Sequence, residues 1–279
     1  MIIFEILKSV ILGIVEGITE WLPISSTGHI ILVDEFLRLN MSDGAKGMFE
    51  VVIQLGAVAA VPIYFFDKLN PFSRTKNEAE KKNTWKLWSK VIVGALPAAI
   101  AGVLLDDFLD GCFYNYFVVA LMLILYGVIF IVVERIKRNK AYKIESVDDI
   151  SYGDALKIGG YQVLSLIPGT SRSGSTILGG MLSGVCRSAS AEFSFFMAIP
   201  IMLGASGLKI LKFILEGLSL TGDEIIVLLI GIAVSFFVSL FSIKFLMDFV
   251  KRHDFAPFGV YRIILGIAVI LYFLIRNCL

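Results

Sequence analysis

The sequence predicts an all-α, polytopic membrane protein built as a single membrane domain over residues 1–279, and two observations support this prediction. The first is composition: 57% of the 279 residues are hydrophobic and 18% are charged, against about 25% charged residues in a typical soluble domain. The second is the recurrence of apolar runs of about 20 residues, the length at which a helix crosses the hydrocarbon core. A transmembrane β-barrel would instead show short segments of alternating polarity.

The apolar runs can be assigned to helices in chain order. A short helix over 2–15 enters a polar stretch and is followed by a second short helix over 27–38. A second polar-interrupted region covers 154–185. The remaining runs are long enough to be full spans. They are predicted near 47–66, 86–106, 115–134, 189–213, 224–247 and 256–276.

Positive charge separates the connecting loops into two groups. Lys and Arg gather in the predicted loops 67–90, 135–157 and 248–255, whereas 107–114 and 214–224 contain neither. Because basic residues are enriched in cytoplasmic loops, the first three loops are predicted inside and the other two outside. The second polar-interrupted region then begins and ends on the cytoplasmic side, so it is predicted to be re-entrant. The first polar stretch is predicted to enter from outside.

An internal repeat is visible around the polar stretches. The motif LPISST at 22–27 aligns with IPGTSR at 167–172. The apolar run that follows each motif carries one acidic residue, Glu50 in the first and Glu192 in the second. Self-similarity of this kind indicates that one structural unit occurs twice.

The repeat divides the domain into two halves, 1–135 and 150–279, joined by a cytoplasmic linker at about 135–153. Three full spans in each half are an odd number, so the second half is predicted to be inserted upside down. Inverted repeats with broken helices place a polar site near the middle of the membrane, where the two breaks meet.

The first break begins with two carboxylates, Glu16 and Glu20, which share one helix face because they are four residues apart. Pro23 then ends or kinks the helix, and His29 closes the polar stretch. Between them lie three hydroxyl residues in the position of an N-cap for the next half-helix: Ser25, Ser26 and Thr27. Free N–H groups and hydroxyls at a helix start suit an anion, above all a phosphate.

The second break carries Arg172, the only basic residue between Ile167 and Thr176. Its planar guanidinium matches phosphate oxygens. Gly169 and Gly174 allow the backbone to turn and to approach a ligand closely. Hydroxyl groups surround the arginine, at Thr170, Ser171, Ser173 and Thr176. The two breaks together predict a site for a phosphorylated lipid with a divalent cation, and no basic stripe indicates nucleic acid.

Other interpretations of these residues remain open. Glu16 and Glu20 would be structural if they only neutralise Arg172, and His29 would be structural if it only caps a helix. Gln54 lies in an apolar span, where a helix–helix hydrogen bond is as good an explanation as a role in substrate binding.

The motifs EGITEWLPISSTGH and PGTSRSG, together with FEVVIQLGA and AEFSFFMAIP, resemble the bacterial undecaprenyl-diphosphate phosphatase family over the whole chain. The resemblance implies an integral plasma-membrane enzyme that removes the terminal phosphate of undecaprenyl diphosphate and recycles the lipid carrier for peptidoglycan synthesis, with a link to bacitracin resistance. It also implies assistance by Mg2+ or Ca2+, an inverted-repeat fold, a homodimer and a site that opens to the extracytoplasmic side.

Roles for the candidate residues follow as hypotheses. Arg172 clamps the diphosphate, Glu16 and Glu20 hold the cation, and either Ser26 or a water molecule is the nucleophile. Glu20 or His29 takes the proton. The remaining candidates for substrate binding are Ser25, Thr27, Gln54, Gly169, Thr170, Ser171, Ser173, Gly174 and Thr176. The alternative function is a polyprenyl-phosphate transporter or flippase, because midplane breaks are also a feature of transporters.

Overall fold

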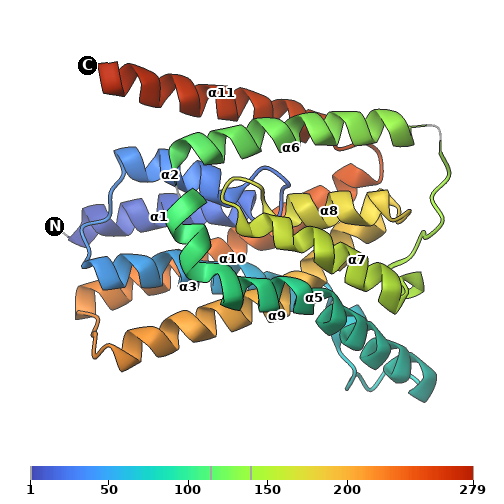
Figure 1. Ribbon diagram of the computed structural model, residues 1–279. Helices are drawn as coiled ribbons and strands as arrows, with labels where there is room; N and C mark the ends of the chain where they lie inside the picture. Colours follow the sequence, from blue (N-terminus) through green and yellow to red (C-terminus); the bar gives the residue numbers. More distant parts are fainter. Residues whose placement is uncertain (1, 114, 139, 279) are drawn as a thin grey trace.

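The structure is a computed structural model that describes residues 2–113, 115–138 and 140–278. Within these ranges the chain is almost wholly helical (Figure 1), and its only β-type pairing is an isolated bridge between Ile144 and Val185. The predicted all-α class is therefore confirmed. The helices run as α1 Ile2–Thr19, α2 Ser26–Phe36, α3 Asp43–Tyr64, α4 Phe66–Leu69, α5 Glu78–Phe113, α6 Tyr116–Lys137, α7 Tyr152–Val163, α8 Arg172–Leu182, α9 Arg187–Leu215, α10 Gly222–Val250 and α11 Ala256–Cys278, with 3₁₀ turns η1 Val147–Asp149 and η2 Leu164–Leu166.

Among the described residues, 6 helices are long and apolar enough to cross a membrane. They are the helices predicted as full spans: α3, α5, α6, α9, α10 and α11. The chain is thus a multi-pass membrane protein. Four of the shorter helices, α1, α2, α7 and α8, form two pairs, and each pair is joined through one of the polar breaks. That these pairs are re-entrant stays a prediction.

Helix α5 is longer than predicted. The sequence predicts a span over 86–106 with loops on both sides, but α5 runs from Glu78 to Phe113. The predicted loop 67–90 is therefore partly helical, and the predicted loop 107–114 is helical as far as Phe113, while position 114 lies outside the described residues. Glu, Lys and Ala are strong helix formers, so the helix begins well before its apolar segment. Figure 1 shows this first part of α5 projecting from the bundle.

Helices of one half of the chain pack against helices of the other half. In the first half α1 packs on α10 of the second, and α7 of the second half packs on α5 of the first. The last helices of the halves, α6 and α11, lie side by side along one edge (Figure 1). Small residues allow close approach: a Cβ on Gly56 of α3 would lie 2.3 Å from a carbonyl oxygen of α10. The inverted relation between residues 1–135 and 150–279 stays a prediction.

Candidate active site

The two breaks have the same backbone geometry. Ser25 has φ 73° and Ser171 has φ 75°, and they are the only non-glycine residues with positive φ in the described part of the chain. Each is the N-cap of the following helix: the Ser25 hydroxyl accepts from the Gly28 amide at 3.3 Å, and the Ser171 hydroxyl from the Gly174 amide at 3.1 Å. Such backbone strain costs about 1–3 kcal/mol per residue and tends to occur at functional sites.

This geometry corrects the register of the repeat by one residue. The aligned motifs pair Ser25 with Thr170, but the shared cap pairs it with Ser171. The motif alignment follows the two prolines, whereas the folded backbone is set by the residue that caps each helix. In the corrected register Ser26 and Arg172 are equivalent, because each is the first residue of its helix.

Glu20 joins these two equivalent residues. Its Oε1 accepts hydrogen bonds from Nε and Nη2 of Arg172, both at 3.2 Å, and its Oε2 accepts from the Ser26 hydroxyl at 2.9 Å. The pair is nearly buried, with side chains of Arg172 and Glu20 that are 10% and 7% exposed. One carboxylate therefore binds both the candidate nucleophile, Ser26, and the candidate phosphate-binding residue, Arg172. These two residues are 146 positions apart in the sequence.

The guanidinium of Arg172 is held on its other side as well. Nη1 donates to the carbonyl oxygen of Ser194 in α9 at 2.8 Å. The Trp21 ring lies against it, with 5.8 Å from Cζ to the ring centroid, and packs edge-on against Phe195. Because Arg has five N–H donors in a fixed fork, at least one donor on Nη2 remains for a ligand.

Most hydroxyls of the second break hold the backbone in this structure. The Ser173 hydroxyl donates to the carbonyl oxygen of Glu20 at 3.1 Å, and Thr176 donates to that of Arg172 at 2.9 Å. Thr170 differs, since its buried hydroxyl has no hydrogen-bond partner among the described residues. In the first break, Thr27 lies half-buried in the first turn of α2.

The backbone conformation at position 169 requires a glycine. Its φ is 89°, and a Cβ there would lie 2.5 Å from a carbonyl oxygen of α6. Gly174 is less restricted, because a Cβ would meet its nearest neighbours at 3.2–3.3 Å. The predicted role of Gly169 in a tight backbone turn is thus explained by the fold, independently of any ligand.

Glu16 lies one helical turn before Glu20, whose amide donates to the Glu16 carbonyl oxygen at 3.0 Å. The Glu16 side chain is fully buried, and neither carboxylate oxygen has a hydrogen-bond partner among the described residues. It lies within electrostatic range of Glu20, Glu50 and Arg172. A buried carboxylate without hydrogen bonds is costly. This orphaned carboxylate therefore fits a cation, although no group of three acidic, His or Cys side chains converges within the described chain.

His29 has no hydrogen bond to the Ser26 hydroxyl in the described structure. Its Nδ1 lies 2.7 Å from the carbonyl oxygen of Ser25, and its Nε2 lies 2.7 Å from the hydroxyl of Tyr261 in α11. Since a carbonyl oxygen only accepts, Nδ1 carries the proton, and Nε2 of a neutral ring accepts from Tyr261. Of the two predicted proton acceptors for Ser26, the hydrogen bonds favour Glu20.

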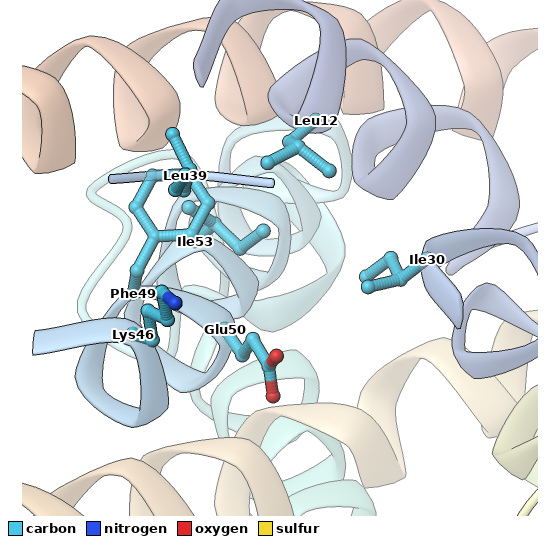
Figure 2. Close-up of a pocket in the computed structure, with 7 residues that line it drawn as sticks. All are labelled: Leu12, Ile30, Leu39, Lys46, Phe49, Glu50 and Ile53. Carbon is cyan, nitrogen blue, oxygen red and sulfur yellow. The ribbon is translucent and has the colours of Figure 1, made fainter. Parts of the chain in front are cut away.

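Two polar residues of the spans, Gln54 and Glu192, have no hydrogen bond to this cluster among the described residues. Gln54 is half-buried on α3, and no hydrogen bond of the described residues joins it to either break. Glu192 forms an ion pair with Lys68, with Nζ 2.7 Å from Oε1. A cavity of about 40 Å³ lies between α1, α2 and α3, and Glu50 and the apolar Ile30 are among the residues that line it (Figure 2). This volume holds only a few water molecules, at about 10–15 Å³ for each on this measure, and is too small for a prenyl chain.

One buried polar residue is missing from the predicted site. Arg262 on α11 is 0% exposed and donates to backbone carbonyls of both breaks, including Pro23 at 3.1 Å and Thr170 at 2.9 Å. The sequence carries the signal, because Arg262 is the one Lys or Arg between Pro257 and Ile275, inside a predicted span. An ionisable residue within a span is a candidate functional residue.

Fold and site together define an integral membrane protein with a buried centre of hydroxyl, carboxylate and guanidinium groups at two helix breaks. The chain belongs to the bacitracin resistance protein BacA family, whose family model matches residues 9–268. It is 55% identical to an undecaprenyl-diphosphatase of Enterococcus faecalis over 98% of this chain and 99% of the relative. It is 56% identical to one of Streptococcus mutans and 53% identical to one of Desulfitobacterium hafniense, each over 99% of both chains.

Proposed function

We propose that the protein is an undecaprenyl-diphosphate phosphatase, which hydrolyses undecaprenyl diphosphate to undecaprenyl phosphate and inorganic phosphate. The observation that carries the proposal is the Glu20 carboxylate, which binds Arg172 and Ser26 at once in a buried site. The relatives' shared name supports the substrate. The product is the lipid carrier of peptidoglycan synthesis, and its recycling would confer bacitracin resistance.

Phosphoryl transfer depends mainly on positioning and on electrostatic stabilisation of the equatorial oxygens. Arg172 is suited to both tasks, because its side chain is fixed by Ser194 and Trp21 and its fork matches a phosphate. A terminal phosphate can bind the Nη2 donor of Arg172 that Glu20 leaves open. Glu20 then keeps its ion pair, and its Oε2, which accepts from the Ser26 hydroxyl at 2.9 Å, is in position to take that proton.

In the proposed reaction the Ser26 hydroxyl attacks the terminal phosphorus and gives its proton to Glu20. The bond from phosphorus to the bridging oxygen breaks, and undecaprenyl phosphate leaves. Water then hydrolyses the phosphoserine and releases inorganic phosphate. The alternative, direct attack by water with Glu20 as the base, needs the same residues except for the Ser26 nucleophile.

A divalent cation, Mg2+ or Ca2+, is proposed as the cofactor. Glu16 and Glu20 would hold it, and when bound it would neutralise phosphate charge. Magnesium in particular is commonly bound by one or two carboxylates together with substrate phosphates. A thermal-shift measurement tests this binding without turnover: Mg2+ or Ca2+ should raise the unfolding midpoint of the wild type, and Glu16→Gln should remove that increase.

The proposal also includes a location. The charge of the loops supports the orientation of the spans, and the resemblance to the family implies a bacterial plasma-membrane protein whose site opens to the extracytoplasmic side. A homodimer is proposed as its assembly, surrounded by membrane lipids. Labelling of a cysteine placed in the predicted cytoplasmic loop 67–90 by a membrane-impermeant reagent on intact cells would overturn this orientation.

The direct test is release of inorganic phosphate from undecaprenyl diphosphate by the purified protein in detergent, with and without a chelator. Arg172→Met should abolish release while the protein stays folded. Detergent removes the two compartments that transport requires, so activity there distinguishes an enzyme from a flippase. A folded, lipid-supplemented protein that releases no phosphate would refute the proposed function and favour the transporter.

A further inference from the structure

Arg262 is a cation buried inside a helix that spans the membrane. Its side chain on α11 is 0% exposed. In the described chain no carboxylate lies within ion-pair distance of it, and the ring of Tyr126 lies against it with its centroid 5.5 Å from Cζ. A buried guanidinium is retained only where its N–H groups are satisfied. The hydrogen bonds of Arg262 must therefore offset the cost of burying its charge.

Those hydrogen bonds connect the two breaks. Nη1 donates to the carbonyl oxygen of Pro23 at 3.1 Å, in the first break. Nη2 donates to the carbonyl oxygens of Gly169 at 2.8 Å and Thr170 at 2.9 Å, in the second. Longer contacts of 3.4–3.5 Å reach α6, at Met122 and Leu123. One planar group thus holds backbone from both halves of the chain.

The acceptors are carbonyls that no helix satisfies. Pro23, Gly169 and Thr170 lie outside helices, and backbone groups away from water must find partners within the protein. Pro23 lies two residues before Ser25, and Thr170 immediately precedes Ser171, the two residues with strained positive φ. Strained backbone persists only where the surrounding structure over-determines it, and Arg262 supplies that restraint at both turns.

We propose that Arg262 is a positioning residue for phosphoryl transfer, which fixes the two breaks against each other so that Ser26 and Arg172 act on one phosphate. This inference rests on the proposed function. Arg262 has no hydrogen bond to Ser26, Glu20 or Arg172 in the described structure, so it acts through the backbone that begins α2 and α8. Its loss should therefore lower kcat far more than it raises KM, because misplacement by about 1 Å can cost about 100-fold in rate.

Lysine is the informative conservative substitution. Its ammonium is a single point with three donors, whereas Arg262 uses two separate nitrogens of a rigid fork. Arg262→Lys keeps the charge but cannot bond both breaks with the same geometry. Arg262→Met removes charge and donors at similar length. We expect kcat to decrease in the order wild type, Lys, Met.

The matched control is Arg276→Met on the same helix. Arg276 is about half-exposed and pairs with Glu35 at 2.8 Å, away from both breaks. A second readout comes from Trp21, which is 0% exposed beside the first break. Replacing Trp85 and Trp88 by Phe leaves Trp21 as the one tryptophan of the chain, so its emission reports directly on this region.

The experiment measures kcat and KM for phosphate release, together with Trp21 emission, for all variants in the single-tryptophan background. The proposal expects Arg262→Met to lose about 100-fold in kcat with KM within about threefold of the wild type, and its Trp21 emission to shift to longer wavelength. Arg276→Met should change neither. An Arg262→Met or Arg262→Lys protein with wild-type kcat and unshifted emission would overturn it. If even the wild type released no phosphate, the proposed function would fail, and the emission shift alone would decide whether Arg262 holds the breaks together.

Discussion

The substitution Glu20→Gln tests the centre of the site most directly. Glutamine has nearly the same shape as glutamate but no charge, so it leaves the buried Arg172 guanidinium without its ion-pair partner. It also removes the carboxylate that accepts from the Ser26 hydroxyl at 2.9 Å. Loss of one partner of a buried pair costs about 3–5 kcal/mol, and loss of a general base costs about 10²–10⁴-fold in rate. Both losses are expected in the same variant.

The assay combines phosphate release in detergent with the midpoint of thermal unfolding. Glu192→Gln is the matched control, because Glu192 is also paired, with Lys68 at 2.7 Å, but that Lys68 side chain is 32% exposed. The Glu192 side chain is 13% exposed, so this pair is less buried than that of Glu20 and Arg172, and the control should lose less stability than Glu20→Gln and keep its activity.

A double variant separates stability from catalysis. If Glu20→Gln destabilises by stranding the Arg172 charge, then adding Arg172→Met should recover much of the lost stability and none of the activity. The reasoning would be refuted by a Glu20→Gln protein whose kcat stays within about tenfold of the wild type. It would also be refuted if the double variant lost as much stability as the two single variants together.

Three further substitutions address single contacts. Ser26→Ala should lower kcat by several orders of magnitude if Ser26 is the nucleophile, and a loss below about tenfold in single-turnover kinetics would favour water instead. Gly169→Ala should lower the thermal midpoint and the yield of folded protein, because the residue has φ 89° and a Cβ would lie 2.5 Å from a carbonyl oxygen; wild-type stability would contradict the strain argument. Tyr261→Phe removes one hydrogen bond to His29, so the free energy of unfolding should fall by about 1 kcal/mol while kcat stays near that of the wild type, because Glu20 takes the Ser26 proton; a large loss of kcat would instead favour His29 as the base, and the same change at Tyr272 on that helix should alter neither.

Much of the fold could be predicted because its signals are local. Six apolar runs long enough to span a membrane correspond to six helices, since hydropathy sums over neighbouring residues. The helix after the first break was predicted to begin at 27 and begins at Ser26, because short hydroxyl side chains cap helices wherever they occur. No helix start was predicted at Arg172. The length of α5 could not be predicted in this way. Its first turns are charged, so the apolar pattern does not show that the helix begins there.

The candidate site was predictable as a set of residues but not as an arrangement. Composition and spacing singled out Glu16, Glu20 and Arg172, because polar groups are costly in a membrane sequence. The sequence did not reveal that Glu20, and not Glu16, pairs with Arg172. It also did not reveal that His29 points to Tyr261.

By itself, therefore, the sequence determined the membrane class, the six spans and the two polar breaks, because each depends on residues within about one helix length of one another. Only the tertiary structure decided the partners of those breaks, the one-residue register between Ser25 and Ser171, and the place of Arg262 between them. The physical reason is that these features depend on how helices far apart in the chain pack together, and hydrophobic periodicity states which face a helix buries but not which backbone it meets.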